Sequence, residues 1–168
     1  MTPREIASVL ESSGEAVVGL LGSLSDEIAS LRPAPGEWCV KECVGHLIEA
    51  ERRGFNGRIR QMLQADEPPL QPWDAAEVAA ARGDCERDLG ALLDEFAELR
   101  RDSVALVVAL QLEQLERGGM HPQVARITVG EIVHEWVHHD ANHLRQALAN
   151  VQDYVWPLMG GTQRFSSG

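Results

Sequence analysis

Residues 128–146, TVGEIVHEWVHHDANHLRQ, decide the fold because they combine a helix start with one long apolar face. Thr128 and Glu131 have the spacing of a capping box, in which a hydroxyl and a carboxylate bind backbone amides at the start of a helix. At about 100° per residue, one broad arc of the helix surface collects the apolar side chains. They are Val129, Ile132, Val133, Trp136, Val137, Leu144 and Leu148. The stretch therefore predicts an amphipathic helix from about Thr128 to Asn150.

Four of the six histidines lie in this expected helix, and they form two pairs with a spacing of four residues. That spacing lets both imidazoles of a pair reach one point, but it does not choose between the pairs. His139 and His143 fall at the edge of the apolar arc, so we expect them to face the bundle. His134 and His138 fall on the opposite, polar side, so we expect them in water.

A second helix is expected over residues 38–64, where Glu42 takes the place of a capping-box carboxylate. His46 lies just off one edge of the apolar arc of this helix. His46, His139 and His143 can then meet at the rim of the core, where imidazole is a good ligand for a divalent transition metal. Three ligands leave a coordination position for water or substrate, as in catalytic zinc sites. The alternative for each histidine is a hydrogen-bonded residue at the edge of the core.

The remaining helices are separated by clusters of proline and glycine, which do not continue a helix. We expect a first helix over residues 3–31, with a weak point at residues 12–14. A third helix is expected over residues 84–115, with an alternative start near Asp74. No segment alternates convincingly with the period of a strand, and residues 124–129 are the one weak candidate.

These elements predict an all-α fold, a four-helix bundle with long crossover connections. Length and composition predict a single domain over residues 1–168. Its core is expected at about 3–150, followed by a C-terminal tail over 151–168 to which no element is assigned.

Charge and cysteine content predict a cytoplasmic protein. The net charge of −11 at pH 7 disfavours nucleic acids and anionic membranes as partners. Residues 1–11 lack the apolar core of a signal peptide, and the apolar run 104–110 is too short to span a bilayer. Cys39, Cys43 and Cys85 are odd in number and lack the spacing of a disulfide framework. Cys43 lies one turn before the histidine of the second helix, and is a core residue, a fourth ligand or a reactive thiol.

Several charged residues fall inside the apolar arcs, where an unpaired charge is costly. Asp140 either orients a ligand histidine or forms a structural ion pair. Glu51 and Arg58 share the inner face of the second helix, and Arg100 of the third helix is expected in the same region. An arginine there either holds an anionic substrate or forms a structural ion pair. Glu49 lies on a polar face and is expected to be solvated.

Two blocks of sequence resemble the DinB/YfiT-like superfamily of metal-binding four-helix bundles. The first, EWCVKECVGHL at residues 37–47, is similar to the family's Trp-Ser-x-x-Glu-x-x-x-His-Leu opening of the second helix. The second, TVGEI at residues 128–132 followed by HDANHLRQ at residues 139–146, is similar to the family's closing helix with His-Asp-x-x-His and a trailing Gln. The family's metal-binding histidines correspond to the three that the helix-face argument selects. Cys39 departs from the usual Ser, which is a better helix cap.

The resemblance implies a divalent metal ion, zinc or nickel before iron or manganese. Family members with an assigned activity resemble transferases that join a small thiol, such as bacillithiol, mycothiol or glutathione, to an electrophile, or isomerases that use the thiol as cofactor. A metal ion in such a site lowers the pKa of the thiol, which then attacks an electrophilic carbon. The expected partners are a small-molecule thiol and an electrophilic substrate, and the resemblance also implies a homodimer. The alternatives are a non-catalytic metal- or ligand-binding protein of a stress response, and an interaction module with incidental histidines.

Overall fold

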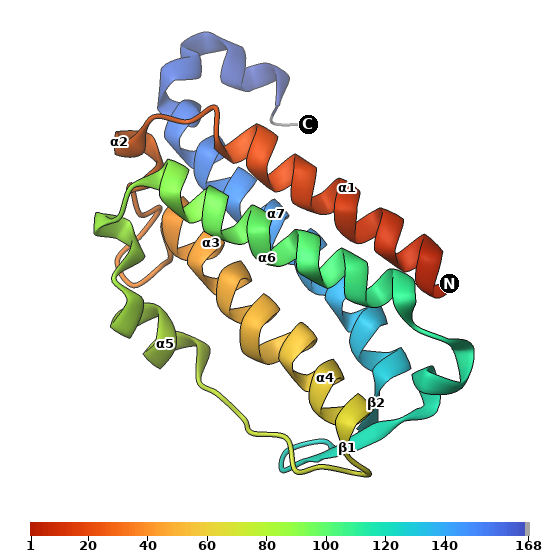
Figure 1. Ribbon diagram of the computed structural model, residues 1–168. Coiled ribbons are helices and arrows are strands. Elements are labelled where there is room, and N and C mark those ends of the chain that lie inside the picture. Colours follow the sequence, from red (N-terminus) through yellow and green to blue (C-terminus); the bar gives the residue numbers. More distant parts are fainter. Residues whose placement is uncertain (167–168) are drawn as a thin grey trace.

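The computed structural model describes residues 1–166, and four long helical rods form its body. The rods are α1 (Pro3–Leu21), the continuous run of α3 (Val40–Glu49), the π-helix η1 (Ala50–Phe55) and α4 (Asn56–Gln64), then α6 (Leu89–Ala109) and α7 (Val129–Val155). The helices α1 and α7 run in one direction, whereas α3–α4 and α6 run in the other (Figure 1). Because α3 packs against the parallel α6, a long crossover connects the second rod to the third. The all-α four-helix bundle with long crossover connections is therefore confirmed.

The long connections carry short elements. They are α2 (Asp26–Ala29), α5 (Ala75–Arg82), the 3-10 helices η2 (Asp84–Glu86) and η3 (Leu112–Glu116), and the strands β1 (Gly118–His121) and β2 (Ala125–Thr128). The strands pair antiparallel, with Gly118 opposite Thr128. Strand β2 coincides with the weak candidate at residues 124–129. Its partner was missed because two of its four residues are glycines, which carry no alternating pattern.

The first and third rods are shorter than expected because short polar side chains start new helices inside the expected ranges. The helix α1 ends at Leu21, and Ser25 caps α2 by accepting a hydrogen bond from a backbone amide three residues later. Asp88 caps α6 in the same way. The weak point expected at residues 12–14 is not observed. Gly14 lies within α1, where a Cβ atom would overlap the Arg100 side chain.

Two apolar clusters fill the core, and buried polar side chains lie where the clusters meet. These polar residues are Glu51, Arg100, Ser103 and Asp140. On α7, the change from one cluster to the other falls between Trp136 and Leu144. His139 and His143 lie in this same interval, so the histidines occupy the middle of the bundle rather than one of its ends.

A disulfide between Cys39 and Cys85 joins the N-terminal end of α3 to η2. It corrects the expectation from the sequence, which gave no sign of a disulfide. The two cysteines are 46 residues apart, and the packing of α5 and η2 against α3 brings them together. Cys43 is free and buried, and burial raises the pKa of its thiol to about 12. Cys43 is therefore a core residue and no reactive thiol.

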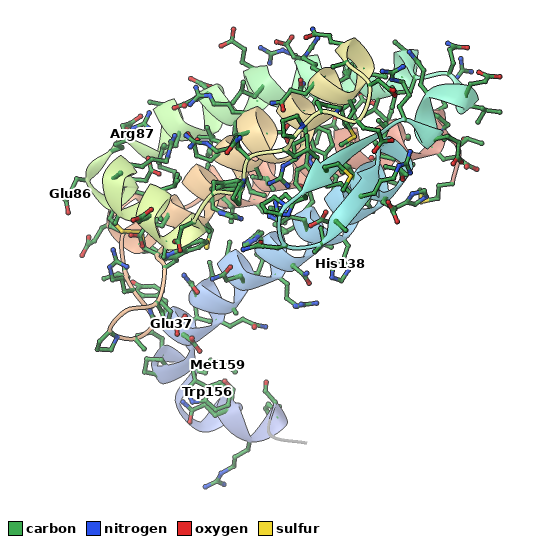
Figure 2. The ribbon with its side chains drawn as sticks, turned by 90° about the horizontal axis from the view of Figure 1, so that it is seen from below. Glu37, Glu86, Arg87, His138, Trp156 and Met159 are labelled. Atoms are coloured by element: carbon green, nitrogen blue, oxygen red, sulfur yellow. A yellow bond between two sulfur atoms is a disulfide. The ribbon has the colours of Figure 1, made fainter. Side chains whose placement is uncertain are left out.

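The last rod continues into a short tail. The helix α7 extends past its expected end, and the 3-10 segment η4 (Trp156–Phe165) occupies a region to which the sequence assigned no element. Figure 2 shows Trp156 and Met159 on this segment, beyond the body of the bundle. Trp156 is 44% exposed and Phe165 is 89% exposed, so these rings do not add to the core. None of the described helices is long and apolar enough to cross a membrane.

Candidate metal centre

Three histidines from two helices meet at one point in the middle of the bundle. His46 comes from α3, and His139 and His143 come from consecutive turns of α7. Their ring centroids lie 5.0 Å (His46–His139), 4.3 Å (His46–His143) and 4.4 Å (His139–His143) apart. One ring nitrogen from each lies within 4.8 Å of the others. The structure thus brings together the three side chains that the helix-face argument selected.

The other histidine pair of α7 faces solvent, as the polar face of the helix indicated. His134 and His138 are both exposed, and Figure 2 shows His138 projecting away from the bundle. The ring of His134 donates from Nδ1 to the backbone oxygen of Gly130, 2.6 Å away. This bond stays within one turn of α7 and involves no other helix.

Burial keeps the clustered imidazoles neutral at neutral pH. The pKa of His46 and of His139 is lowered to about 3, chiefly by burial and in part by the nearby His143. The pKa of His143 is also lowered by burial, although its hydrogen bond to Gln146 opposes that shift. A metal ion binds only the neutral form of imidazole, so these three rings do not need to lose a proton first.

The hydrogen bonds of the cluster leave ring nitrogens aimed at a common point. His143 donates from Nδ1 to Oε1 of Gln146 at 2.9 Å, which leaves the lone pair of its Nε2 free. The Nε2 atoms of His46 and His139 lie 2.9 Å apart. Only one of two neutral rings can donate there, and both Nδ1 atoms are buried with no partner among the described residues. The three neutral rings therefore cannot satisfy all of their nitrogens by hydrogen bonds to one another. Three such nitrogens are a ligand set that fits one divalent metal ion.

Aromatic rings surround the histidines. Trp38 lies 5.0 Å and Trp73 lies 5.5 Å from the ring of His46, measured between centroids. Phe55, at the end of the π-helix, lies edge-on to His139 with centroids 5.0 Å apart. Sequence patterns do not predict the position of Trp73, because it lies in the long connection after α4, where no periodic pattern reports which side chains turn inward.

Arg100 is enclosed by carboxylates in the core. It donates from Nη2 to Oδ1 of Asp140 at 3.0 Å and from Nε to Oε1 of Glu51 at 2.7 Å. Ser13 donates to Asp140 and Ser103 donates to Glu51. Burial raises the pKa of Glu51, and the charge of Arg100 opposes that shift. Within residues 1–166, Asp140 forms no hydrogen bond to an imidazole. Of the two alternatives for Asp140, the structure therefore supports a structural ion pair rather than a carboxylate that orients a ligand histidine.

Arg58 does not join this network. Its Nη2 donates to the backbone oxygen of Gln71 at 3.2 Å and lies 3.3 Å from Nε2 of His121. His121 is buried at the end of β1. Of the two arginines expected near the site, only Arg58 is free of a buried carboxylate partner.

Glu49 is buried, which corrects the expectation that it is solvated. It is 3% exposed and forms ion pairs with Arg53 at 2.5 Å and with Arg82 at 2.7 Å. The expectation failed because α5 and η2 cover the polar face of α3. One signal was present in the sequence: Gly45 lies on that face, and a Cβ atom there would overlap the carboxylate of Asp84.

Comparisons with known proteins agree with this geometry. The sequence matches the family model of the DinB superfamily over residues 10–147. No curated protein sequence matches the chain. Among solved structures, YfiT from Bacillus subtilis, described as a probable metal-dependent hydrolase with an unusual four-helix bundle topology, is similar with a TM-score of 0.81 and 21% sequence identity. The match covers 89% of this chain and 86% of that chain, and at this identity it shows the fold alone.

Proposed function

The chain belongs to the DinB superfamily, and from this premise we propose that it binds one divalent metal ion through His46, His139 and His143. The observation that carries the proposal is the convergence of three neutral imidazoles from two helices within 4.8 Å of one another. Imidazole donors suit zinc, nickel and iron, and we propose zinc or nickel first, with iron or manganese as alternatives.

The residues around the histidines prepare the site for a nucleophile. A bound ion of this kind supplies Lewis acidity and lowers the pKa of a thiol or of water at a free coordination position. Gln146 holds His143 in one tautomer. The three neutral rings would leave the charge of an ion uncompensated, and Trp38, Trp73 and Phe55 put apolar surface beside the site. Charge acts more strongly in such a water-poor site.

The finer proposal is an enzyme that transfers a small thiol to an electrophile, or uses the thiol in an isomerisation. Its support is the resemblance of the two histidine blocks to superfamily members of that kind. In the transfer, the thiol loses its proton to water, a bond forms between its sulfur and an electrophilic carbon, and the leaving group departs with its electron pair. Bacillithiol, mycothiol and glutathione are the candidate thiols.

A second candidate is hydrolysis, with water in place of the thiol. The likeness to YfiT favours it, because that protein is described as a probable metal-dependent hydrolase. The same histidines would serve both reactions, so only an assay with both nucleophiles separates them. A metal-binding protein without catalytic activity is the third outcome of such an assay.

The proposed function is tested first by metal content and then by turnover. Protein purified without a histidine tag is loaded with zinc or nickel and assayed with each thiol and an aryl chloride, and in parallel with an ester. We expect about one ion per chain in the parent protein and in His138→Ala, and loss of both the ion and turnover in His46→Ala. Equal metal content in parent and His46→Ala would rule out the metal site, and thiol turnover no faster than that of His46→Ala would rule out the transferase.

A further inference from the structure

A cavity of about 250 Å³ lies beside the histidine cluster, between the second rod and the connection that follows it. Cationic and amide side chains line it together with one indole ring. They include Arg52, Arg53, Arg58, Gln61, Gln71 and Trp73. No carboxylate contributes to this lining within residues 1–166, although the chain as a whole carries a net charge of −11. The lining therefore has the chemistry of an anion site rather than of an apolar pocket.

Arg58 is the cation of this cavity without an ion-pair partner. Its bonds go to the backbone oxygen of Gln71 and to the ring of His121, and its Nε is buried with no hydrogen-bond partner among the described residues. Burial lowers the pKa of Arg58, and the charge of Glu135 opposes this shift only from beyond ion-pair distance. Arg100, which is more deeply buried, has two carboxylate partners instead. A partly buried guanidinium with an unused donor is costly unless an anion completes it.

The other two arginines of the cavity share their carboxylates with further cations. Glu49 accepts ion pairs from Arg52, Arg53 and Arg82. Within the described ion-pair network, Glu95 is likewise shared between Arg52 and two more arginines. Asp84 pairs with Arg82 and Arg87 as well. Within the described residues, the four arginines of this network still outnumber its three carboxylates, so the cavity keeps a positive potential.

Trp73 connects the cavity to the histidine cluster. The ring centroids of Trp73 and His46 lie 5.5 Å apart, and the guanidinium carbon of Arg53 lies 5.8 Å from the ring centroid of Trp73. Trp73 thus borders both the cavity and the histidine cluster, so a substrate held in the cavity lies next to the proposed metal ligands. The volume of the cavity suits a carboxylate with a short carbon chain.

We propose that this cavity binds the carboxylate of the substrate, with Arg58 as the principal cation and Arg53 as the second. The carboxylate forms charge-assisted hydrogen bonds with the guanidinium of Arg58. The carboxylate site itself depends only on these residues. Its part in positioning the reactive end of a substrate rests on the proposed metal-dependent function.

The test uses the full chain after removal of metal ions with a chelator, so that no anion can bind to a metal. Succinate is the anionic probe, succinamide is its neutral counterpart, and titration calorimetry at low ionic strength measures their affinities. We expect saturable binding of succinate and much weaker binding of succinamide. Arg58→Gln should weaken succinate binding at least about tenfold, since it removes a charged hydrogen-bond donor. Arg60→Gln is the matched control, because Arg60 is exposed on the same helix and, among residues 1–166, hydrogen-bonds only to Asn56.

Two further variants keep the outcome decisive. If Arg58→Gln does not fold, Arg53→Gln takes its place, because the Arg53 side chain is more exposed. This variant should also weaken succinate binding. His46→Ala should lose zinc binding yet keep succinate binding, whereas Arg58→Gln should show the reverse, so failure of the metal site and failure of the carboxylate site are separate results. Equal affinity for succinate and succinamide, or equal succinate affinity in Arg58→Gln and Arg60→Gln, would overturn the proposal.

Discussion

The two histidine pairs of α7 share one helix, one spacing and one residue type, yet they lie in opposite environments. His134 and His138 are exposed to solvent. His139 and His143 face the bundle beside His46 of α3, and burial lowers the pKa of His139 to about 3. The difference shows that a spacing of four residues only permits two rings to share an ion. The neighbouring helix turns the spacing into a candidate site, because it supplies the third nitrogen and removes the water.

The largest expected effect comes from removing one histidine of each pair in turn. His139→Ala or His143→Ala removes one of the three proposed ligands, and we expect the affinity for zinc to fall more than about 100-fold. Loss of a mere hydrogen-bonding partner of a ligand already costs about 10- to 100-fold in affinity. His134→Ala and His138→Ala should change the affinity by less than about twofold. Competition with a chromophoric chelator measures all four variants.

Circular dichroism of each variant shows whether the helices are intact, so a loss of affinity can be assigned to the missing ring. Losses of similar size from both pairs would contradict the distinction between the two faces. So would an unchanged affinity in both His139→Ala and His143→Ala.

Acidification of the metal-free protein gives the next largest effect. The pKa of His46 and of His139 is about 3 in the folded chain, against an ordinary value of 6.5. Between these values the unfolded chain binds protons that the folded chain does not, so the free energy of unfolding falls as the pH drops from about 6.5 toward 3. Each ring accounts for a loss of roughly 2 kcal/mol between pH 7 and pH 5.

Urea unfolding of chelator-treated protein at pH 7 and pH 5 measures this loss. The double variant His46→Leu/His139→Leu lacks both rings and should lose less stability on acidification. The variant His138→Leu removes an exposed imidazole and should retain the pH dependence of the parent. If the double variant kept that pH dependence as well, the loss of stability would have to come from other groups.

The parts of the molecule that the sequence predicted depend on local patterns. The capping box at the start of α7 is present, with the backbone amide of Thr128 donating to Glu131 at 2.7 Å. Helical periodicity separated the inner from the outer histidine pair, because each residue advances by the same angle along a regular helix. His46 needed no more than the same argument applied to the second rod. The four rods and the three converging histidines could therefore be found before any coordinates were known.

The parts that the sequence did not predict depend on what packs against each rod. Glu49 was expected in water because helical periodicity treats the polar face of α3 as solvent, whereas α5 covers it. The Cys39–Cys85 disulfide and the position of Trp73 follow from the paths of the long connections, which no periodic pattern determines. Arg58 was expected near the site, but its lack of a carboxylate partner is a property of the folded surroundings.

The smallest effect concerns how one member of the inner pair is held. Gln146 accepts the Nδ1–H of His143, which keeps the lone pair on Nε2. Gln146→Ala leaves all three proposed ligands in place but frees the ring to rotate and to exchange tautomers, so we expect zinc affinity to fall by about tenfold. Gln146→Glu keeps an acceptor and should bind zinc at least as tightly as the parent. Asn142→Ala is the matched control, since this amide lies on the same helix and accepts from Arg145 instead of from a histidine. If Gln146→Ala bound zinc as tightly as Asn142→Ala, packing alone would orient His143. Only burial and the third imidazole would then distinguish the inner histidine pair from the outer pair.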